Sequence, residues 1–306
     1  MAHVLERDSI ILEDQALRDG LQMEKQIFSL EEKIKIFNLL VEGGLKRIQV
    51  GSFVNPKLLP QMSDTDQLVQ KLIHTSGVLL NALVLNDKGL GRAIECGLTH
   101  VSLAVSASDT HSQKNVNRSS KEALTAMVHM ISEAKQAGLK VRAGVMCAFG
   151  CVYEGKIPES KVLAVAEAMV MAGADGINLA DTTGMGNPLQ VRQLVQRVRE
   201  VFPDRTLSLH LHDTQGLGLV NMLAGYEAGV RIFDVAAGGL GGCPFIKGAG
   251  GNIPTEDAVN MFESIGVKTG IEIQKICLVV DIFESLLGRQ LPGRMGRVLK
   301  AKTSEI

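Results

Sequence analysis

SKVLAVAEAMVMAG, residues 160–173, is followed by ADGINLADTTGMGN (174–187), PLQVRQLVQRVREVF (188–202) and PDRTLSLHLH (203–212). The first and third segments carry apolar residues at the three- and four-residue spacing of an amphipathic helix. The second and fourth contain short apolar runs whose length and composition are typical of strands buried in a parallel sheet. This stretch therefore predicts helices alternating with parallel strands.

The same alternation extends along the chain. Helical patterns such as residues 29–44 and 86–97 also separate apolar runs in the first half. The candidate strands are residues 10–12, 47–50, 78–84, 101–105, 141–146, 176–179, 207–212 and 231–235. Eight strand and helix steps in 306 residues predict an α/β fold, a (β/α)8 TIM barrel, which typically needs about 250 residues plus decorations.

Helix boundary signals agree with this prediction. Ser29 and Glu32 form a capping-box pair at an expected helix start. Glycines stand where helices are expected to end, at positions 43, 44, 97, 138, 173 and 229. Because no proline-rich linker divides the chain, we expect one catalytic domain over residues 1–306, with residues 254–306 as a helical appendage packed on the barrel.

Composition limits the kind of partner. The 32 basic and 33 acidic residues are spread along the chain and give a net charge of -1, which argues against a nucleic-acid or membrane-surface partner. No apolar run approaches the roughly 20 residues that span a bilayer. The start has no apolar secretory segment, and the five cysteines are an odd number, so we expect reduced thiols in a cytoplasmic protein.

Chemistry in a barrel takes place at the carboxyl ends of the strands. His210 and His212 end the seventh expected strand, and since side chains alternate along a strand, both imidazoles point to the same side. Arg18 and Asp19 follow the first expected strand. A carboxylate facing two imidazoles fits a divalent metal, Mg²⁺ or Mn²⁺ first and Zn²⁺, Co²⁺ or Ni²⁺ as alternatives, whereas two histidines alone would be a polar pair in the core.

The segment from Gly238 to Asn252 contains seven glycines, a density that allows close backbone approach to a ligand or the movement of a lid. A flexible surface loop would have the same composition. It would not explain Cys243 beside a proline, because an exposed thiol is an oxidation liability unless it is used. We therefore expect Cys243 to lie near the substrate.

Taken together, these motifs resemble the hydroxymethylglutaryl-CoA lyases, metal-dependent barrel enzymes related to isopropylmalate and homocitrate synthases. The resemblance covers essentially the whole chain, and its most specific part is the Cys243 loop, which the synthases lack. It is carried by RDGLQ (18–22), GSFVNPKLLPQMSD (51–64), KNVN (114–117), C-x3-C with YEGK (147–156), HLHDT (210–214) and GGLGGCPFIKGAGGNIPTED (238–257).

The resemblance implies cleavage of 3-hydroxy-3-methylglutaryl-CoA to acetyl-CoA and acetoacetate by a metal-assisted retro-Claisen reaction. It also implies that family members are often oligomeric. The implied metal ligands are Asp19, His210, His212 and Asn252, and the implied catalytic residues are Arg18 for the enolate, Cys243 for proton transfer and Asp181. Gln22 of the RDGLQ motif is expected at the substrate. Lys25, Lys57, Lys114 and Lys247 are candidates for the CoA phosphates because they lie in loops expected at the barrel mouth, with a solvated surface lysine as the alternative for each.

Three positions depart from the lyase pattern. Gln49 stands where the family has a glutamate, Gly144 where it has a tyrosine and Met23 where it has an asparagine. Loss of the carboxylate makes the site more positive, and loss of the tyrosine opens space beside the substrate. We therefore hypothesise that Gln49 and Gly144 contact a related 3-hydroxy acyl-CoA with a different group at C3.

Two other functions stay open from the sequence. The first is a synthase-type acyltransferase that condenses acetyl-CoA with a 2-oxo acid, since LRDG (17–20) and NLADTTG (178–184) also resemble that branch. The second is a metal-binding barrel without catalysis, motivated by Gln49 and Gly144. The Cys243 loop favours the lyase over the synthase, and the intact Arg18 favours an enzyme.

Overall fold

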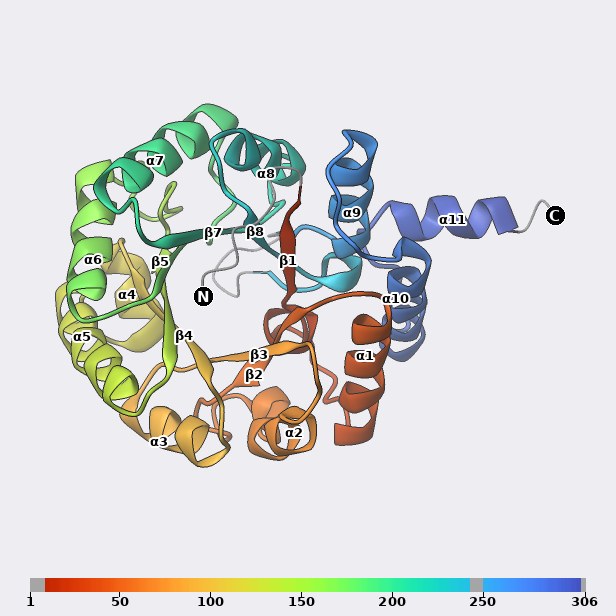
Figure 1. Cartoon of the computed structure of the whole chain (residues 1–306), viewed down its shortest axis with the longest axis horizontal. Helices are drawn as coiled ribbons and strands as arrows, with labels where there is room; N and C mark the ends of the chain where they lie inside the picture. The colour runs from red at the N-terminus through yellow and green to blue at the C-terminus, as the bar shows by residue number, and fades with distance from the viewer. Residues whose placement is uncertain (1–8, 243–249, 304–306) are drawn as a thin grey trace.

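The computed structural model describes residues 9–242 and 250–303. Its strands are parallel and close into a barrel in chain order, with β8 pairing with β1 (Figure 1). The predicted (β/α)8 barrel is confirmed. The strands are β1 (Ile11–Asp14), β2 (Arg47–Ser52), β3 (Leu79–Leu83), β4 (His100–Ser106), β5 (Lys140–Met146), β6 (Gly176–Asp181), β7 (Thr206–Leu211) and β8 (Ile232–Val235).

Helices surround the barrel (Figure 1). Those between strands are α1 (Leu30–Glu42), α2 (Thr65–Leu72), α3 (Asp87–Glu95), α4 (Asp109–Val116), α5 (Ser120–Gln136), α6 (Glu159–Met171), α7 (Pro188–Val201) and α8 (Gly218–Glu227). After β8 come α9 (Thr255–Ser264), α10 (Ile273–Leu287) and α11 (Met295–Thr303), and three short turns complete the set: η1 (Ala16–Gly20), η2 (Pro60–Met62) and η3 (Ala237–Gly239). Within the described ranges, no helix is long and apolar enough to cross a membrane.

Local signals explain where the helices begin and end. Ser29 caps α1 through the expected capping box, in which its Oγ accepts from the N–H of Glu32 at 3.2 Å and Oε2 of Glu32 accepts from the N–H of Ser29 at 2.7 Å. Five of the glycines expected at helix ends have a positive φ, at positions 44, 97, 138, 173 and 229. Glycine adopts this conformation without the strain that a Cβ would bring, so it ends the helix there.

Burial on both faces explains the continuous apolar runs of the strands. Every residue of β6 is buried, as are all but the first residue of β2 and of β7, because one face packs inside the barrel and the other against helices. Polar side chains are nevertheless buried on several strands, among them Glu13, Gln49, Ser102, His210 and Asp234. Buried polar groups in an otherwise apolar sheet mark the place where function is located.

The C-terminal helices lie on the same side of the barrel as α1 (Figure 1), and among them α10 packs against α1. Two buried carboxylates connect this region to the barrel. Oδ2 of Asp14 accepts from Oγ1 of Thr255 at 2.7 Å and from the N–H of Ala237 at 3.0 Å. Oε2 of Glu256 accepts from the N–H of Gly238 at 3.0 Å. Together they hold the start of the glycine-rich segment in place.

Glu256 makes the stability of this junction depend on pH. Burial raises the pKa of Glu256 to about 8 from 4.5, against backbone hydrogen bonds that lower it. Between these two values the folded state holds a proton that the unfolded chain has lost, so stability falls as the pH rises through this window. At about 1.4 kcal/mol per pH unit, the loss is roughly 5 kcal/mol.

We therefore expect Glu256→Gln to remove most of this pH dependence. Urea unfolding at pH 5 and pH 8 measures the free energy of unfolding. Between these two pH values, this free energy should fall less for the variant than for the wild type. Glu167→Gln, a change at an exposed residue of α6, serves as the control. The same pH dependence in wild type and Glu256→Gln would contradict the assignment.

Candidate active site and metal centre

The four residues expected as metal ligands converge beyond the carboxyl ends of the strands. Asp19 lies in η1 just after β1, His210 and His212 lie at the end of β7, and Asn252 pairs with His212 through a β-bridge. One ligand atom each from Asp19, His210 and His212 lies within 4.8 Å of the others, and all three residues are buried. The fold thus joins side chains that are up to 233 positions apart in the sequence.

The two imidazoles are arranged like neighbouring ligands of one ion. Their Nε2 atoms are 3.0 Å apart, and two ligands at right angles around an ion, each at about 2.1 Å, are also about 3.0 Å apart. Nδ1 of His210 lies 3.2 Å from Oδ2 of Asp234, which favours a proton on Nδ1 and leaves the Nε2 lone pair free. Two facing lone pairs repel unless a cation or a proton lies between them.

Asn252 fits as a fourth ligand. Its Nδ2 donates to Oδ2 of Asp19 at 2.7 Å and to the backbone oxygen of Leu240 at 2.9 Å. Its Oδ1 is buried and has no hydrogen-bond partner among the residues that the structure describes. An unpaired amide oxygen on a residue that contacts Asp19 and pairs with His212 has the acceptor capacity that a divalent cation uses. The side chains present therefore fit a divalent metal.

The protonation states suit ligation as well. Burial by itself raises the pKa of Asp19, but the Arg18 guanidinium and the two imidazoles outweigh it and hold the pKa of this carboxyl well below its usual range. Burial lowers the pKa of His210, although the hydrogen bond to Asp234 raises it. At neutral pH the site contains an ionised carboxylate and a neutral imidazole at position 210, which are the forms that bind metal.

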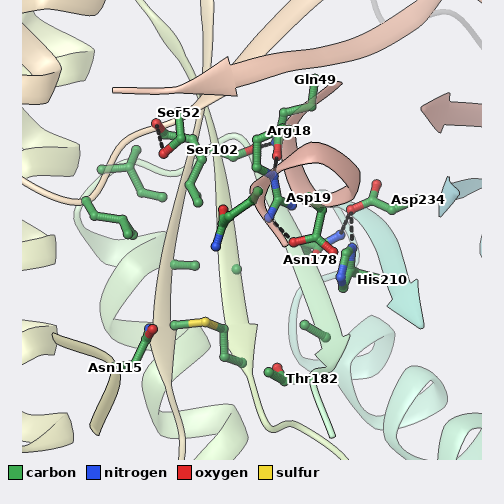
Figure 2. Close-up of a pocket in the computed structure, with 18 of the residues that line it drawn as sticks. Arg18, Asp19, Gln49, Ser52, Ser102, Asn115, Asn178, Thr182, His210 and Asp234 are labelled. Carbon is green, nitrogen blue, oxygen red and sulfur yellow. Dashed lines mark hydrogen bonds and ion pairs between the residues drawn. The ribbon is translucent and has the colours of Figure 1, made fainter. Parts of the chain in front are cut away.

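Arg18 is held beside these ligands by three acceptors. Its Nε donates to Oε1 of Gln49 and its Nη1 to Oδ1 of Asp19 (Figure 2). Its Nη2 donates to Oε1 of Gln15 at 2.9 Å. Because Gln49 accepts this hydrogen bond without adding a negative charge, more of the guanidinium charge remains available to an anion than a glutamate would leave.

A chain of hydrogen bonds connects Gln49 to His210 through the barrel interior. Nε2 of Gln49 and Nε of Arg142 both donate to Oγ of Ser102, at 3.2 Å and 3.0 Å. Nη1 of Arg142 donates to Oδ1 of Asp234 at 2.7 Å, and Oδ2 of Asp234 faces the imidazole of His210 (Figure 2). The sequence-based predictions missed Ser102, Arg142 and Asp234. Charged residues inside apolar strands were the available signal, since buried charges need partners.

We expect Asp234→Asn to weaken metal binding about 10- to 100-fold, the usual effect of removing a carboxylate that orients a ligating histidine. The amide removes the negative charge opposite Nδ1 of His210 and can present an N–H there instead. Calorimetric titration with Mn²⁺ measures the change, with Asp204→Asn at an exposed position as the control. Equal dissociation constants for Asp234→Asn and wild type would rule out a positioning role for Asp234.

Asp19, His210 and His212 line a cavity of about 180 Å³. Three residues expected at the substrate line it, namely Gln22, Gln49 and Gly144. In Figure 2, Arg18, Asp19 and His210 gather at one end of the cavity, and Asn115 and Thr182 lie toward the other end. Apolar residues line much of the remaining wall: Val54, Leu59, Leu83, Leu85, Leu103, Ala104, Met146 and Ala180.

Asp181 lies outside the cavity lining. Its two carboxylate oxygens accept from the N–H groups of Met185 at 3.1 Å and Gly186 at 3.0 Å. Burial raises its pKa, against the hydrogen bond from Gly186 and the charge of His212. The structure therefore places Asp181 where it fixes the loop between β6 and α7, and its catalytic role remains a prediction.

Three of the four candidate CoA lysines, Lys25, Lys57 and Lys114, do not line the cavity. Lys25, Lys57 and Lys114 are exposed, and Nζ of Lys114 lies 5.0 Å from the ring centroid of Tyr153. Cys243 and Lys247 lie outside the described residues. The roles assigned to these five residues, proton transfer for Cys243 and CoA binding for the lysines, therefore remain predictions.

A parallel barrel whose mouth presents one carboxylate, two imidazoles and an amide oxygen defines the class of metal-dependent (β/α)8 enzymes. Comparison with protein families gives the particular group. Residues 9–282 match the family model named HMGL-like. The chain belongs to the HMGL-like family, which confirms the resemblance found in its motifs.

Relatives that match over nearly the whole chain are lyases. A hydroxymethylglutaryl-CoA lyase of Bacillus subtilis (strain 168) is 38% identical over 284 residues, covering 93% of this chain and 95% of the relative. An (R)-citramalyl-CoA lyase of Chloroflexus aurantiacus is 38% identical over 300 residues, covering 95% of each. This similarity confirms that the chain is an enzyme of the lyase branch.

Solved structures agree with this family. An HMG-CoA lyase from Acinetobacter baumannii, in complex with coenzyme A and 3-methylmalate, has a TM-score of 0.90 at 38% identity, covering 95% of each chain. The crystal structure of the Bacillus subtilis HMG-CoA lyase has a TM-score of 0.91 at 36% identity, covering 96% of this chain and 98% of the other.

Proposed function

We propose that the enzyme cleaves 3-hydroxy-3-methylglutaryl-CoA, or a related 3-hydroxy acyl-CoA, to acetyl-CoA and an oxo acid by a metal-assisted retro-Claisen reaction. The observation that carries the proposal is one cavity that joins the Arg18 guanidinium to the ligand set of Asp19, His210 and His212. The lyase relatives and the coenzyme A bound to the Acinetobacter baumannii enzyme support an acyl-CoA substrate.

The reaction breaks the C2–C3 bond of the substrate, and the chain supplies groups for both halves. When bound at the four ligands, a divalent ion supplies Lewis acidity that lowers the pKa of a chelated C3 hydroxyl. Asp19, His210, His212 and Asn252 would hold it, with Mg²⁺ or Mn²⁺ as the proposed ions and Zn²⁺, Co²⁺ or Ni²⁺ as alternatives.

Arg18 serves the other half of the substrate. The departing two-carbon unit carries negative charge as a thioester enolate, and a fixed guanidinium stabilises this charge as it develops. Gln49, Asp19 and Gln15 hold the guanidinium in one orientation, so little reorganisation is needed during the reaction. We propose the thiol of Cys243 as the donor of the proton that the enolate carbon then takes up. A water that accepts the proton lost by the C3 hydroxyl returns one to the thiolate, so the reaction consumes no net proton.

This chain departs from the lyase pattern at residues that we expect to contact the group at C3 of the substrate. Gln49 and Gly144 both line the cavity, and they replace an acidic and a bulky aromatic residue of that pattern. Relatives of equal identity are named for hydroxymethylglutaryl-CoA and for (R)-citramalyl-CoA. Overall identity therefore leaves the acyl group open, and we propose that these two positions select it.

A substrate panel tests the function. The purified enzyme with Mn²⁺ should release acetyl-CoA from at least one 3-hydroxy acyl-CoA, and chelation should stop the release. We expect Gln49→Glu to shift the preference toward 3-hydroxy-3-methylglutaryl-CoA. If the wild type already cleaves that compound at a rate usual for enzymes, the proposal that this chain prefers a different substrate is contradicted. Release of free CoA from acetyl-CoA and 2-oxo acids would instead indicate a synthase.

We further propose a cytoplasmic, single-domain enzyme without nucleic-acid or membrane partners, with a homo-oligomer as the expected assembly. The balanced charge supports the absence of nucleic-acid and membrane partners. Four of the cysteines are free and buried, namely Cys96, Cys147, Cys151 and Cys277, as a reducing compartment would keep them.

A further inference from the structure

The catalytic cavity continues into a second recess. This recess has a volume of about 410 Å³ and is lined by the carboxyl end of β4, the start of α3 and the helices α4 and α5. The cavity and the recess share six lining residues: Val54, Leu59, Leu85, Ala104, Asn115 and Met146. The two hollows therefore adjoin, and the recess lies within reach of a ligand whose reacting end is at Arg18.

The inner part of the recess is apolar. Val105, Met127 and Met130 are buried in its wall, and Ala123 and Ala126 of α5 are half-buried beside them. Apolar walls of this kind stabilise a bound hydrocarbon chain, because binding removes the chain from water. The two methionines add side chains that adapt to the shape of a flexible ligand.

Most of the polar residues that line the recess are exposed and therefore form its rim. They are Asn55, Asn86, Asp87, Asn115 and Arg118. Two serines are the buried polar exceptions. Oγ of Ser106 already accepts from the N–H of Ser108 at 3.1 Å, and Oγ of Ser112 has no partner among the described residues. The interior thus offers too few hydrogen bonds for a phosphate or a chain of amides, whereas a hydrocarbon needs none.

Small side chains stand where the cavity meets the recess. Gly144 lies opposite Ala104 in the register of β4 and β5, and a Cβ added at Gly144 would come within 3.1 Å of the Cβ of Ala104. The tyrosine of the lyase pattern would place a ring at this position. With glycine, the chain keeps this side of the cavity open toward Ala104, one of the residues shared with the recess.

We propose that the recess binds an aliphatic substituent at C3 of the substrate that is longer than methyl, an inference that rests on the proposed lyase function. The substituent enters past Ala104, while the thioester arm leaves through the mouth of the barrel. The volume of the recess lies within the range of about 300–1,000 Å³ that small-molecule sites have. The preferred substrate class is thus a 3-hydroxy-3-alkylglutaryl-CoA with an extended alkyl group.

The wild-type enzyme with Mn²⁺ tests this with 3-hydroxy-3-alkylglutaryl-CoA thioesters whose alkyl group lengthens from methyl to hexyl. We expect kcat/KM to rise about fourfold per added methylene until the recess is filled, which corresponds to about 0.8 kcal/mol each. A methyl compound cleaved as fast as the longer ones, or faster, overturns the recess proposal and leaves the lyase function intact. Cleavage of no member of the series also overturns the recess proposal, and the proposed lyase function then fails only if every 3-hydroxy acyl-CoA of the wider panel is left uncleaved.

Ala126→Leu fills the recess and gives a second test. We expect the ratio of kcat/KM for the butyl compound to that for the methyl compound to fall at least about tenfold. Ala164→Leu, the same change at an exposed position of α6, should keep the wild-type ratio. If Ala126→Leu raises KM equally for every thioester, the recess holds the CoA arm, which is common to all of them, and the proposal is wrong.

Discussion

Removal of the divalent ion, or of one imidazole through His210→Ala, is expected to lower kcat at least about 10³-fold. A metal that polarises a bound oxygen contributes several kcal/mol to the transition state, and about 4 kcal/mol corresponds to a factor of 10³. His210 is a strong test position because its Nε2 lies 3.0 Å from Nε2 of His212. Loss of either lone pair therefore leaves an incomplete ligand set.

Two controls separate metal loss from unfolding. His74→Ala removes an exposed imidazole and should retain wild-type activity and Mn²⁺ affinity. Thermal unfolding of His210→Ala should stay cooperative, and calorimetry should show Mn²⁺ affinity at least about 100-fold weaker than that of the wild type, because a direct ligand contributes more than its orienting neighbours do. Chelated enzyme that keeps full activity after exhaustive dialysis would exclude a metal-dependent mechanism.

The fold could be predicted because its main signal is local. A strand buried on both faces needs an apolar run, and a helix that packs on such strands needs apolar residues on one side, so both patterns are visible in stretches such as residues 160–212. The ends of the strands were less certain, as with β6, which continues to Asp181 beyond the apolar run. Helix α11 lacked a clear signal because its pattern is mixed and its residues are largely exposed.

The candidate site was predictable only where one strand carried the information. His210 and His212 share a face by alternation alone, and that argument needs no long-range contact. Arg142 and Asp234 pair across 92 positions, so their contact depends on the closure of the barrel. Asn252 was reached only through the resemblance, since nothing local indicates that this asparagine contacts Asp19 and pairs with His212 across the barrel mouth.

The position of Arg18 shows a further limit of sequence reasoning. The residues after β1 form a single turn of π-helix, Ala16–Gly20, a rare element that is often found at functional sites. This turn places two consecutive side chains, Arg18 and Asp19, at the same cavity. In a strand, neighbouring residues would point to opposite faces, so the arrangement follows from the turn.

Arg18→Ala is expected to lower kcat about 10²- to 10³-fold, the usual cost of removing one group that stabilises a developing oxyanion. Mn²⁺ affinity should change much less, since Asp19, His210 and His212 all remain. Arg18→Lys should not restore the rate, because an ammonium group cannot reproduce the planar set of contacts to Gln49 and Asp19. Steady-state kinetics on the best substrate of the panel measures both variants.

Arg192→Ala is the matched control for Arg18. Arg192 lies on α7, its side chain is 43% exposed, and its ion pair with Glu227 is at the surface, so its loss should leave kcat within about twofold of the wild type. Arg18→Ala with more than a tenth of the wild-type kcat would show that the enolate charge is stabilised elsewhere. Loss of kcat in Arg18→Ala together with intact Mn²⁺ binding would show that Arg18 acts on the reacting substrate and not through the metal site.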